Sequence, residues 1–300
     1  MLEPLGRQAP AATTAEPRPE GAWRTTWREL RRRPLAVLGG AVTILLYLVA
    51  IFAPWLAPYS PNAIHPLAVL QPPGPQHLLG TDNFGRDLLS RLIFGARSSL
   101  FVGFVAVAII IVVGVTLGAI SGYLGGTVDM LIMRVVDVFL SIPTFFLLLT
   151  VVAVFGQGLL QTMIVIGLTS WMSTARLVRG QFLALRDSDF AVAARALGGG
   201  GRQVVMRHLL PNTMAVIIVQ ATLYLSYAVL IESSLSYLGL GVQPPTASWG
   251  NILAQGQQVM LQDPYMTTFA GLAIFITVMA FNLLGDGLRD ALDPRLRGLR

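Results

Sequence analysis

The sequence of 300 residues contains no cysteine and no lysine, so all 21 of its basic residues are arginines. Without cysteine the chain can form no disulfide and offers no thiolate nucleophile and no ligand for an iron–sulfur cluster. Without lysine it has no phosphate-binding P-loop, because the GxxxxGK[ST] motif uses its lysine to neutralise the β- and γ-phosphates of a nucleotide. If ATP drives this protein, another chain must hydrolyse it.

Charged residues and histidines are also scarce. Only 12% of the residues are charged and 54% are hydrophobic, which is more apolar surface than one water-soluble core can hide, so the composition predicts a membrane protein. The net charge of +6 comes from arginines beside apolar segments, which favours contact with anionic lipid headgroups over nucleic acid. His65, His77 and His208 lie outside the apolar runs, so we expect neither an intramembrane hydrolase nor a metal site.

Six stretches without charge are long enough, or nearly so, to cross a hydrocarbon core that needs about 20 helical residues. They predict an all-α polytopic membrane protein with six transmembrane helices. The predicted spans cover residues 35–57, 98–120, 138–155, 159–175, 213–231 and 265–285. The first is too long for a cleaved signal peptide, and no small-residue cleavage site closes it.

The arginines predict the orientation of these spans. Seven arginines precede the first span, six lie in segment 176–212 and four follow the last span, whereas only three lie in segment 58–97. Cytoplasmic segments are enriched in arginine and lysine, and an even number of spans puts both ends of the chain on one side. We therefore expect a multi-pass protein of the bacterial inner membrane with both termini in the cytoplasm.

The longest charged segment between spans, 176–212, predicts a short cytoplasmic helix. Asp187, Ser188 and Asp189 are candidates for its N-cap, and the four glycines from 198 to 201 favour its end. A second helical run, 202–210, leads to Pro211 at the start of the fifth span. From these residues alone, the short helix fits a groove in a soluble partner or lies on the lipid surface as an interfacial helix.

Polar motifs in order along the chain carry a family resemblance. They are LGTDNFGRDLLSRLIFGARSSLFVG at 79–103, GYLGG at 122–126 with Asp129, MRVVD at 133–137, WMSTARLVRG at 171–180, RHLLPN at 207–212, ESSLSYLGLGVQPP at 232–245 and FNLLGDGLRDALDPRLR at 281–297. With these motifs the chain resembles the permease subunits of bacterial ABC importers, and among them the second permease of the dipeptide/oligopeptide branch. The motifs follow one another over a stretch of some 220 residues, so the resemblance is specific.

The resemblance implies a type I, MetI-like ABC importer permease in which segment 176–212 is the EAA loop, whose coupling helix docks on a separate ATPase. The ATPase-coupling residues that it implies are Asp189, Phe190, Ala193, Ala194, Arg195, Leu197, Gly198 and Arg202. The implied partners are a second permease, two ABC ATPase subunits and an external substrate-binding protein, in addition to the lipid bilayer. ATP and Mg²⁺ would bind to the ATPase subunits, and this chain would bind no cofactor.

One position departs from the family pattern. Val192 stands where the family usually has the glutamate that heads the motif, and Gly199 replaces a serine or similar residue after the glycine. We therefore expect Asp189, Arg195 and Arg202 to supply more of the electrostatic contact with the ATPase.

Ionisable residues near the spans are costly in hydrocarbon and are therefore candidates for function. Arg134 and Asp137, three residues apart on one helical face, are most simply an internal ion pair. Glu232, with Ser233 and Ser236, is a candidate for the translocation path; alternatively its carboxylate is bonded to backbone turns around Gly239 and Gly241. The predicted external platform contains Asp82, Arg86 and Asp87, which either brace it or contact a substrate-binding protein.

We expect four segments. Residues 1–22 form a disordered cytoplasmic tail, 23–97 carry the first span and an external loop, 98–293 form the permease domain with five helices, and 294–300 form a C-terminal tail. The competing class of function is a secondary transporter or channel that works alone. Such a protein is expected to show paired broken helices or ion ligands at the membrane midplane, and the central parts of these spans contain no cluster of charged residues.

Overall fold

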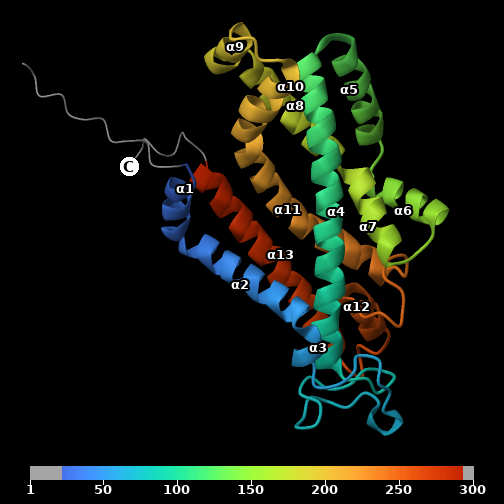
Figure 1. Ribbon diagram of the computed structural model, residues 1–300. Helices are drawn as coiled ribbons and strands as arrows, with labels where there is room; N and C mark the ends of the chain where they lie inside the picture. The colour runs from blue at the N-terminus through green and yellow to red at the C-terminus, as the bar shows by residue number, and fades with distance from the viewer. Residues whose placement is uncertain (1–21, 293–300) are drawn as a thin grey trace, which may run out of the picture.

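The computed structural model describes residues 22–292, and these residues form helices joined by short connections and two longer irregular segments (Figure 1). The helices are α1 (Ala22–Arg31), α2 (Pro34–Ile51), α3 (Ala53–Leu56), α4 (Leu88–Leu124), α5 (Gly126–Ser141), α6 (Thr144–Phe155), α7 (Leu159–Ser170), α8 (Met172–Arg186), α9 (Asp189–Ala196), α10 (Gly201–Val204), α11 (Leu210–Tyr237), α12 (Trp249–Gln258) and α13 (Tyr265–Leu292), with a 3₁₀ turn at Pro66–Ala68 and a π turn at Val205–Leu209. Within the described part, no strand forms. The predicted tails lie almost wholly outside it.

The all-helical fold class is confirmed, whereas the count of six spans is not. Four helices are long and apolar enough to cross a membrane: α2, α4, the continuous helix Gly201–Tyr237 and α13. They contain most or all of the first, second, fifth and sixth predicted spans. A fifth candidate is the pair α5 and α6.

The third and fourth predicted spans are not straight helices. α5 and α6 meet at an angle of 93°, and the break lies at Ile142 and Pro143, where the ring of a proline disfavours helical backbone in the residue before it. α7 has 12 residues and ends at Ser170, and α8 begins at Met172, so Trp171 interrupts the fourth predicted span. The length of α7, about 18 Å at 1.5 Å per residue, is less than the hydrocarbon thickness of about 30 Å.

Helix α4 is the central element of the fold. Its 37 residues span roughly 55 Å at 1.5 Å per residue, so it extends well beyond a hydrocarbon core. Along its length it packs against α2, α7, α8, α11 and α12. The largest buried cluster joins its residues Val102 and Ala106 to Ile166 of α7 and to Ala228 and Leu235 of α11.

A stripe of glycines on α4 lets α8 approach closely. Gly114, Gly118 and Gly122 lie four residues apart on one face of the helix. A Cβ atom added to Gly118 would lie 2.5 Å from the carbonyl oxygen of Ala175, and one added to Gly122 would lie 2.6 Å from Cβ of Phe182. Small residues at this spacing let helices pack at short distance, where van der Waals contact and not hydrophobic exclusion holds membrane helices together. The α4–α8 contact is therefore specified by the absence of side chains.

The same principle joins the two ends of the chain. α2 packs against α13, and a Cβ atom on Gly39 would lie 2.7 Å from the carbonyl oxygen of Ala280. Arg33, just before α2, forms an ion pair with Asp290 near the end of α13. Figure 1 shows α1 beside the end of α13, and both lie nearer the middle of the long axis than α9 does. The ends of α4, α5 and α8 and the α9–α10 segment thus project beyond them.

These contacts predict opposite effects for one substitution at two glycines. Gly118→Ala should lower the thermal unfolding midpoint of the purified full chain in detergent, because over-packing of a tight contact costs about 1–3 kcal/mol. Gly180→Ala is the matched control, because a Cβ at Gly180 of α8 meets nothing within 4 Å and alanine favours a helix by up to about 1 kcal/mol over glycine. Equal midpoints for the two variants would contradict the glycine-mediated contact.

Candidate functional site

The predicted short cytoplasmic helix is present as α9, Asp189–Ala196. Ser188 has the extended backbone of an N-cap residue but makes no side-chain cap bond; its hydroxyl donates instead to the carbonyl oxygen of Leu185. At the other end, Gly198 adopts φ of +86°, a conformation that favours glycine, and the amide of Gly199 donates to the carbonyl oxygen of Ala194. The glycine run therefore ends the helix in the predicted way.

α9 has an inner face and an outer face. Ala191 is fully buried in a cluster with Phe182 of α8 and Val204 of α10, and Ala194 is half-buried at its edge. The outer face carries exposed residues, with Phe190 at 39% and Leu197 at 89% exposure. A hollow of about 400 Å³ lies over it, lined by Phe190, Ala193, Ala194, Leu197, Gly198, Gly199, Gln203 and His208. Five of the eight predicted coupling residues thus line one surface hollow.

The three remaining predicted coupling residues surround this hollow without lining it. Arg202 lies in an adjoining hollow with Gly200, Gly201 and Met206. Arg195 donates through Nη2 to the carbonyl oxygen of Arg186, 2.6 Å away, and so is partly engaged at the end of α8. Asp189 is exposed in the first turn of α9.

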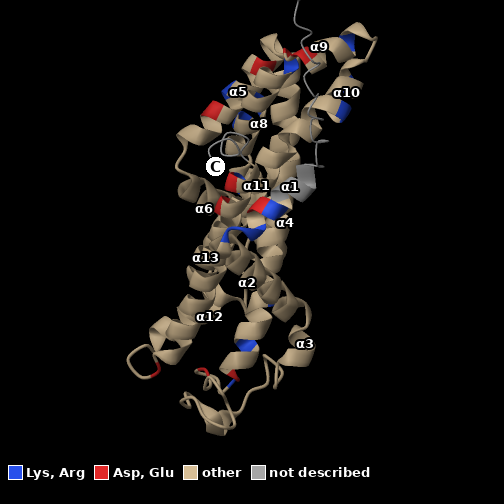
Figure 2. Ribbon diagram, turned by 90° about the vertical axis from the view of Figure 1, so that its left-hand side faces the viewer, with Lys and Arg blue, Asp and Glu red and all other residues tan. Residues whose placement is uncertain are grey.

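The hollow adjoins a long helix, which supplies Gln203 and His208 to its lining. The predicted run 202–210 is helical, but it forms α10 and a π turn that continue into α11 without a break at Pro211. α9 therefore stands between α8 and a continuous 37-residue helix. Figure 2 shows charged residues gathered at this end of the molecule, on α5, α8, α9 and α10.

An ion pair fixes α5 to α8 behind the hollow. Arg179 of α8 donates through Nε and Nη2 to both carboxylate oxygens of Asp129 on α5, at 2.5 and 2.7 Å. The hydroxyl of Ser121 on α4 donates to the same carboxylate. The Asp129 carboxylate holds the pKa of the Arg179 guanidinium above its usual value, mainly through these hydrogen bonds. Arg186 also donates to the carbonyl oxygen of Gly122.

The predicted ion pair between Arg134 and Asp137 is not the one in the structure. Asp137 accepts from Nη2 of Arg176 on α8, 2.7 Å away. The spacing of Arg134 and Asp137 allowed a pair within one helix, but α8 packs against α5 and brings Arg176 across. The acidic residues of α5 thus bind α8.

Glu232 and its neighbouring serines form a buried polar cluster. Glu232 is fully buried, and its carboxylate accepts from the hydroxyls of Ser236 at 2.7 Å and Ser233 at 3.4 Å. The hydroxyls of Ser99 on α4 and Ser248 before α12 face the same carboxylate. The partners are therefore serine hydroxyls, and not backbone turns at Gly239 and Gly241 as the alternative had it. This cluster joins α11 to α4 and α12. The assignment of Glu232, Ser233 and Ser236 to a translocation path stays a prediction, and the burial of all three residues does not favour it.

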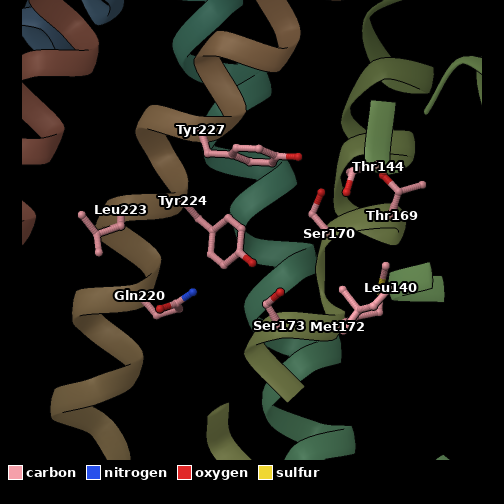
Figure 3. A pocket seen from close by; sticks show the side chains of 10 residues that line it. All are labelled: Leu140, Thr144, Thr169, Ser170, Met172, Ser173, Gln220, Leu223, Tyr224 and Tyr227. Carbon is pink, nitrogen blue, oxygen red and sulfur yellow. The ribbon is translucent and has the colours of Figure 1, made fainter. Parts of the chain in front are cut away.

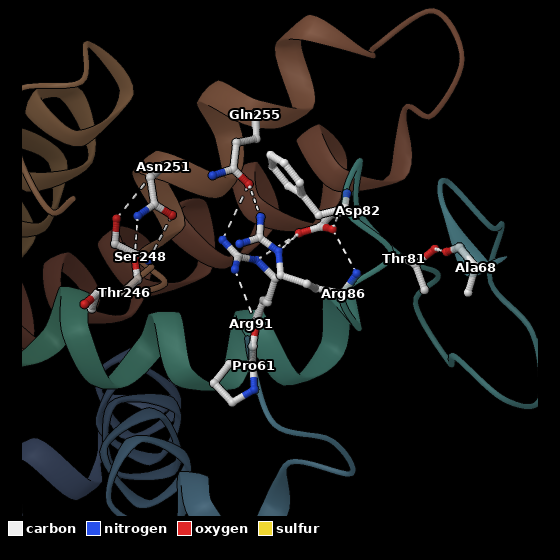
Figure 4. A network of polar contacts seen from close by, with 11 residues as sticks. Pro61, Ala68, Thr81, Asp82, Arg86, Arg91, Thr246, Ser248, Asn251 and Gln255 are labelled. Atoms are coloured by element: carbon white, nitrogen blue, oxygen red, sulfur yellow. Dashed lines mark hydrogen bonds and ion pairs between the residues drawn. The ribbon is translucent and has the colours of Figure 1, made fainter. Parts of the chain in front are cut away.

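The residues of the predicted external platform form a second buried network (Figure 4). Asp82 is fully buried and accepts from Nε of Arg86 at 2.6 Å, and it is also paired with Arg91. Both guanidinium groups reach Oε1 of Gln255 on α12. Asp87 caps α4 through the amide and hydroxyl of Ser90 and contacts His77 at 2.9 Å. These buried residues brace segment 57–87 against α4 and α12.

A second hollow lies at the two helix breaks (Figure 3). Its volume is about 320 Å³, and its lining residues come from α5, α6, α7, α8 and α11. They are Leu140, Thr144, Thr169, Ser170, Met172, Ser173, Gln220, Leu223, Tyr224 and Tyr227. We call this space the membrane hollow. Sequence reasoning missed it, because its residues come from five helices and the breaks at Pro143 and Trp171 were not foreseen.

Comparison with known proteins now adds to this geometry. Residues 114–298 match the family described as binding-protein-dependent transport system inner membrane component, and residues 21–73 match the N-terminal transmembrane domain of oligopeptide transport permease C. The first match alone covers more than half of the chain. The chain belongs to the family of ABC importer permeases. It is a multi-pass membrane subunit and not an enzyme.

Three relatives cover nearly the whole permease. The dipeptide transport system permease protein DppC of Alkalihalophilus pseudofirmus is 41% identical over 275 residues, which are 92% of this chain and 90% of the relative. The glutathione transport system permease protein GsiD of Escherichia coli O6:K15:H31 is 43% identical over 277 residues, which are 92% of this chain and 91% of the relative. The oligopeptide transport system permease protein OppC of Bacillus subtilis is 37% identical over 297 residues, which are 99% of this chain and 97% of the relative.

The permease offers a matched pair of carboxylates to test the α5–α8 contact. Asp129→Ala should reduce the free energy of unfolding by about 1–2 kcal/mol, because it removes the bidentate, charge-assisted hydrogen bonds to Arg179 at a partly buried site. Asp137→Ala should cost about 0.5 kcal/mol or less, since its contact with Arg176 is half-exposed on both sides. Denaturant unfolding of the two variants measures this difference, and a larger loss for Asp137→Ala would contradict it.

Proposed function

We propose that this permease forms, together with a second permease, the membrane path of an importer for di- or oligopeptides, and that α9 docks into a groove of one of two ABC ATPase subunits. The single observation that supports docking is the outer face of α9. Exposed Phe190 and Leu197 flank small Ala193 over a hollow at the projecting end of the molecule. An apolar, small-residue face with a hollow is suited to a protein surface, because it permits close contact with another backbone.

The relatives support the proposed cargo. Their names describe transport of dipeptides, oligopeptides and glutathione, which is itself a short peptide. The distribution of arginines supports an orientation in which α9 and both termini lie in the cytoplasm. In that orientation segment 57–87 lies outside, where it forms part of the platform for an external binding protein.

The contacts of α8 and α11 suggest how hydrolysis elsewhere drives transport. ATP and Mg²⁺ bind to the ATPase subunits, and this chain supplies no group to them. ATP binding draws the coupling helices of the two permeases together and opens the path outward, and hydrolysis releases it. α9 is packed on α8, and after the glycine run the chain enters the continuous helix Gly201–Tyr237, so a displacement of α9 acts on both helices.

The alternative of a stand-alone secondary transporter draws on one observation. α5 and α6 form a broken helix, which such transporters use for ion or substrate sites. The ten residues around that break in the membrane hollow carry no formal charge, so they offer no carboxylate for a coupling ion.

The docking proposal predicts different results for one glutamate at two adjacent positions. Ala193→Glu should abolish co-purification of the ATPase subunits and peptide uptake, because it puts a charge into the hollow on the docking face. Val192→Glu should preserve both, since Val192 is not among the residues that line the hollow and the resemblance places a glutamate there. Membrane insertion of both variants, checked by extraction and gel filtration, is the control.

Retained ATPase binding and uptake in Ala193→Glu would refute the assignment of α9. Deletion of the ATPase subunits separates the two classes of function. Uptake that persists without them would support the stand-alone transporter and contradict the importer.

A further inference from the structure

The membrane hollow lies where two interrupted helices face an uninterrupted one. Thr169 and Ser170 at the end of α7 and Ser173 at the start of α8 lie on one side of the hollow, and Gln220, Tyr224 and Tyr227 of α11 lie on the other (Figure 3). On α11 these residues follow a helical stripe with spacings of four and three. The hollow therefore has two walls from segments far apart in the sequence.

The lining is uncharged and mixed, with polar groups beside the apolar side chains of Leu140, Met172 and Leu223. Hydroxyl groups come from threonine, serine and tyrosine, and a carboxamide comes from Gln220. Hydroxyl and carboxamide groups can each donate and accept hydrogen bonds. The rings of Tyr224 and Tyr227 contact each other edge to face, with centroids 5.8 Å apart, and add an aromatic surface.

Part of this hydrogen-bonding capacity is unused. Thr169 donates to the carbonyl oxygen of Val165, within its own helix. By contrast, Ser170 is only 7% exposed, and its hydroxyl makes no hydrogen bond of ordinary geometry in the described part of the chain. The phenol of Tyr227 faces this hydroxyl. A buried polar group without a partner costs free energy, and more so at membrane depth, where lipid supplies none. The Ser170 hydroxyl therefore favours water or a polar ligand in this part of the hollow.

We propose that the membrane hollow is a subsite of the translocation path that binds the uncharged amide groups of the cargo backbone. This inference rests on the proposed function as a peptide importer. Each peptide unit brings one N–H and one C=O group that lose water in a low-dielectric path. Ser170, Gln220 and Tyr227 replace that water by hydrogen bonds to the backbone N–H and C=O groups. All peptides carry these groups, so the contact does not depend on the side chains of the cargo. The lack of a charge in the lining keeps the contact weak enough for the cargo to leave.

The absence of cysteine from the chain makes the test direct. In the assembled transporter in nanodiscs, Ser173→Cys is treated with a charged, membrane-impermeant thiol reagent, with and without trialanine. Ser173 is exposed at the hollow, so we expect labelling, and trialanine at twice its dissociation constant should slow it about threefold. Trisarcosine, whose N-methylated backbone lacks N–H donors, should protect several-fold less. Phe104→Cys, on the outer surface of α4, is the control and should not react.

Uptake supplies a second readout. Tyr227→Phe should raise the trialanine concentration needed for half-maximal uptake about fivefold, the effect of one lost hydrogen bond. Tyr47→Phe is its control, because the Tyr47 hydroxyl is also buried without a hydrogen bond among the described residues but lies in a different groove, beside α2 and α4.

Three results would overturn the subsite. They are an unreactive Ser173→Cys in a complex that imports peptide, equal protection by trialanine and trisarcosine, and equal uptake by wild type and Tyr227→Phe. Failure of the proposed function gives a different result, namely a wild-type complex that hydrolyses ATP but imports no peptide, whatever the labelling shows.

Discussion

The fold depends on the close approach of α8 to α4 along Gly114, Gly118 and Gly122. Because no side chain separates the two backbones, α8 lies at a fixed depth and rotation on the 37-residue helix α4. That placement brings Arg179 to Asp129 on α5 and Phe182 under α9. It also puts Ser170 and Ser173, on either side of Trp171, into the wall of the membrane hollow. One contact thus positions both the candidate coupling helix and the candidate path.

The two ends of α8 have different chemistry, and this difference suits the proposed roles. From its middle toward α9, α8 carries Arg179, which pairs with Asp129 of α5, and Arg186, which donates to the carbonyl oxygen of Gly122. At the hollow, hydroxyl groups without charge predominate. A charged, hydrogen-bonded clamp resists deformation, whereas an uncharged polar wall can exchange one set of weak contacts for another. A displacement of α9 would therefore reach the hollow as a movement of a rigid helix.

Much of this architecture could be predicted from the sequence, and the exceptions have physical causes. Apolar runs predicted the membrane helices, and Ser188 and the glycines after Leu197 predicted the short helix, because both signals are local. The third and fourth spans were not confirmed as continuous helices, because Pro143 breaks the third after Ile142 and Trp171 interrupts the fourth. The partner of Asp137 was wrong because packing of α8 brought Arg176 nearer than local spacing could show. The membrane hollow was not predicted at all, because hydroxyl residues spread over five helices carry no motif.

The central claim is that α8, held on α4, joins the nucleotide state of the ATPase to the membrane hollow. The most direct test is the rate of thiol labelling of Ser173→Cys in the assembled transporter, with and without Mg²⁺ and a non-hydrolysable ATP analogue. Gly180→Cys is the reference, because position 180 lies on the same helix and a Cβ atom there meets nothing within 4 Å. The account predicts a several-fold change at position 173 on nucleotide binding, with little change at position 180. Equal rates at position 173 in both states, in a complex with active ATPase subunits, would contradict it.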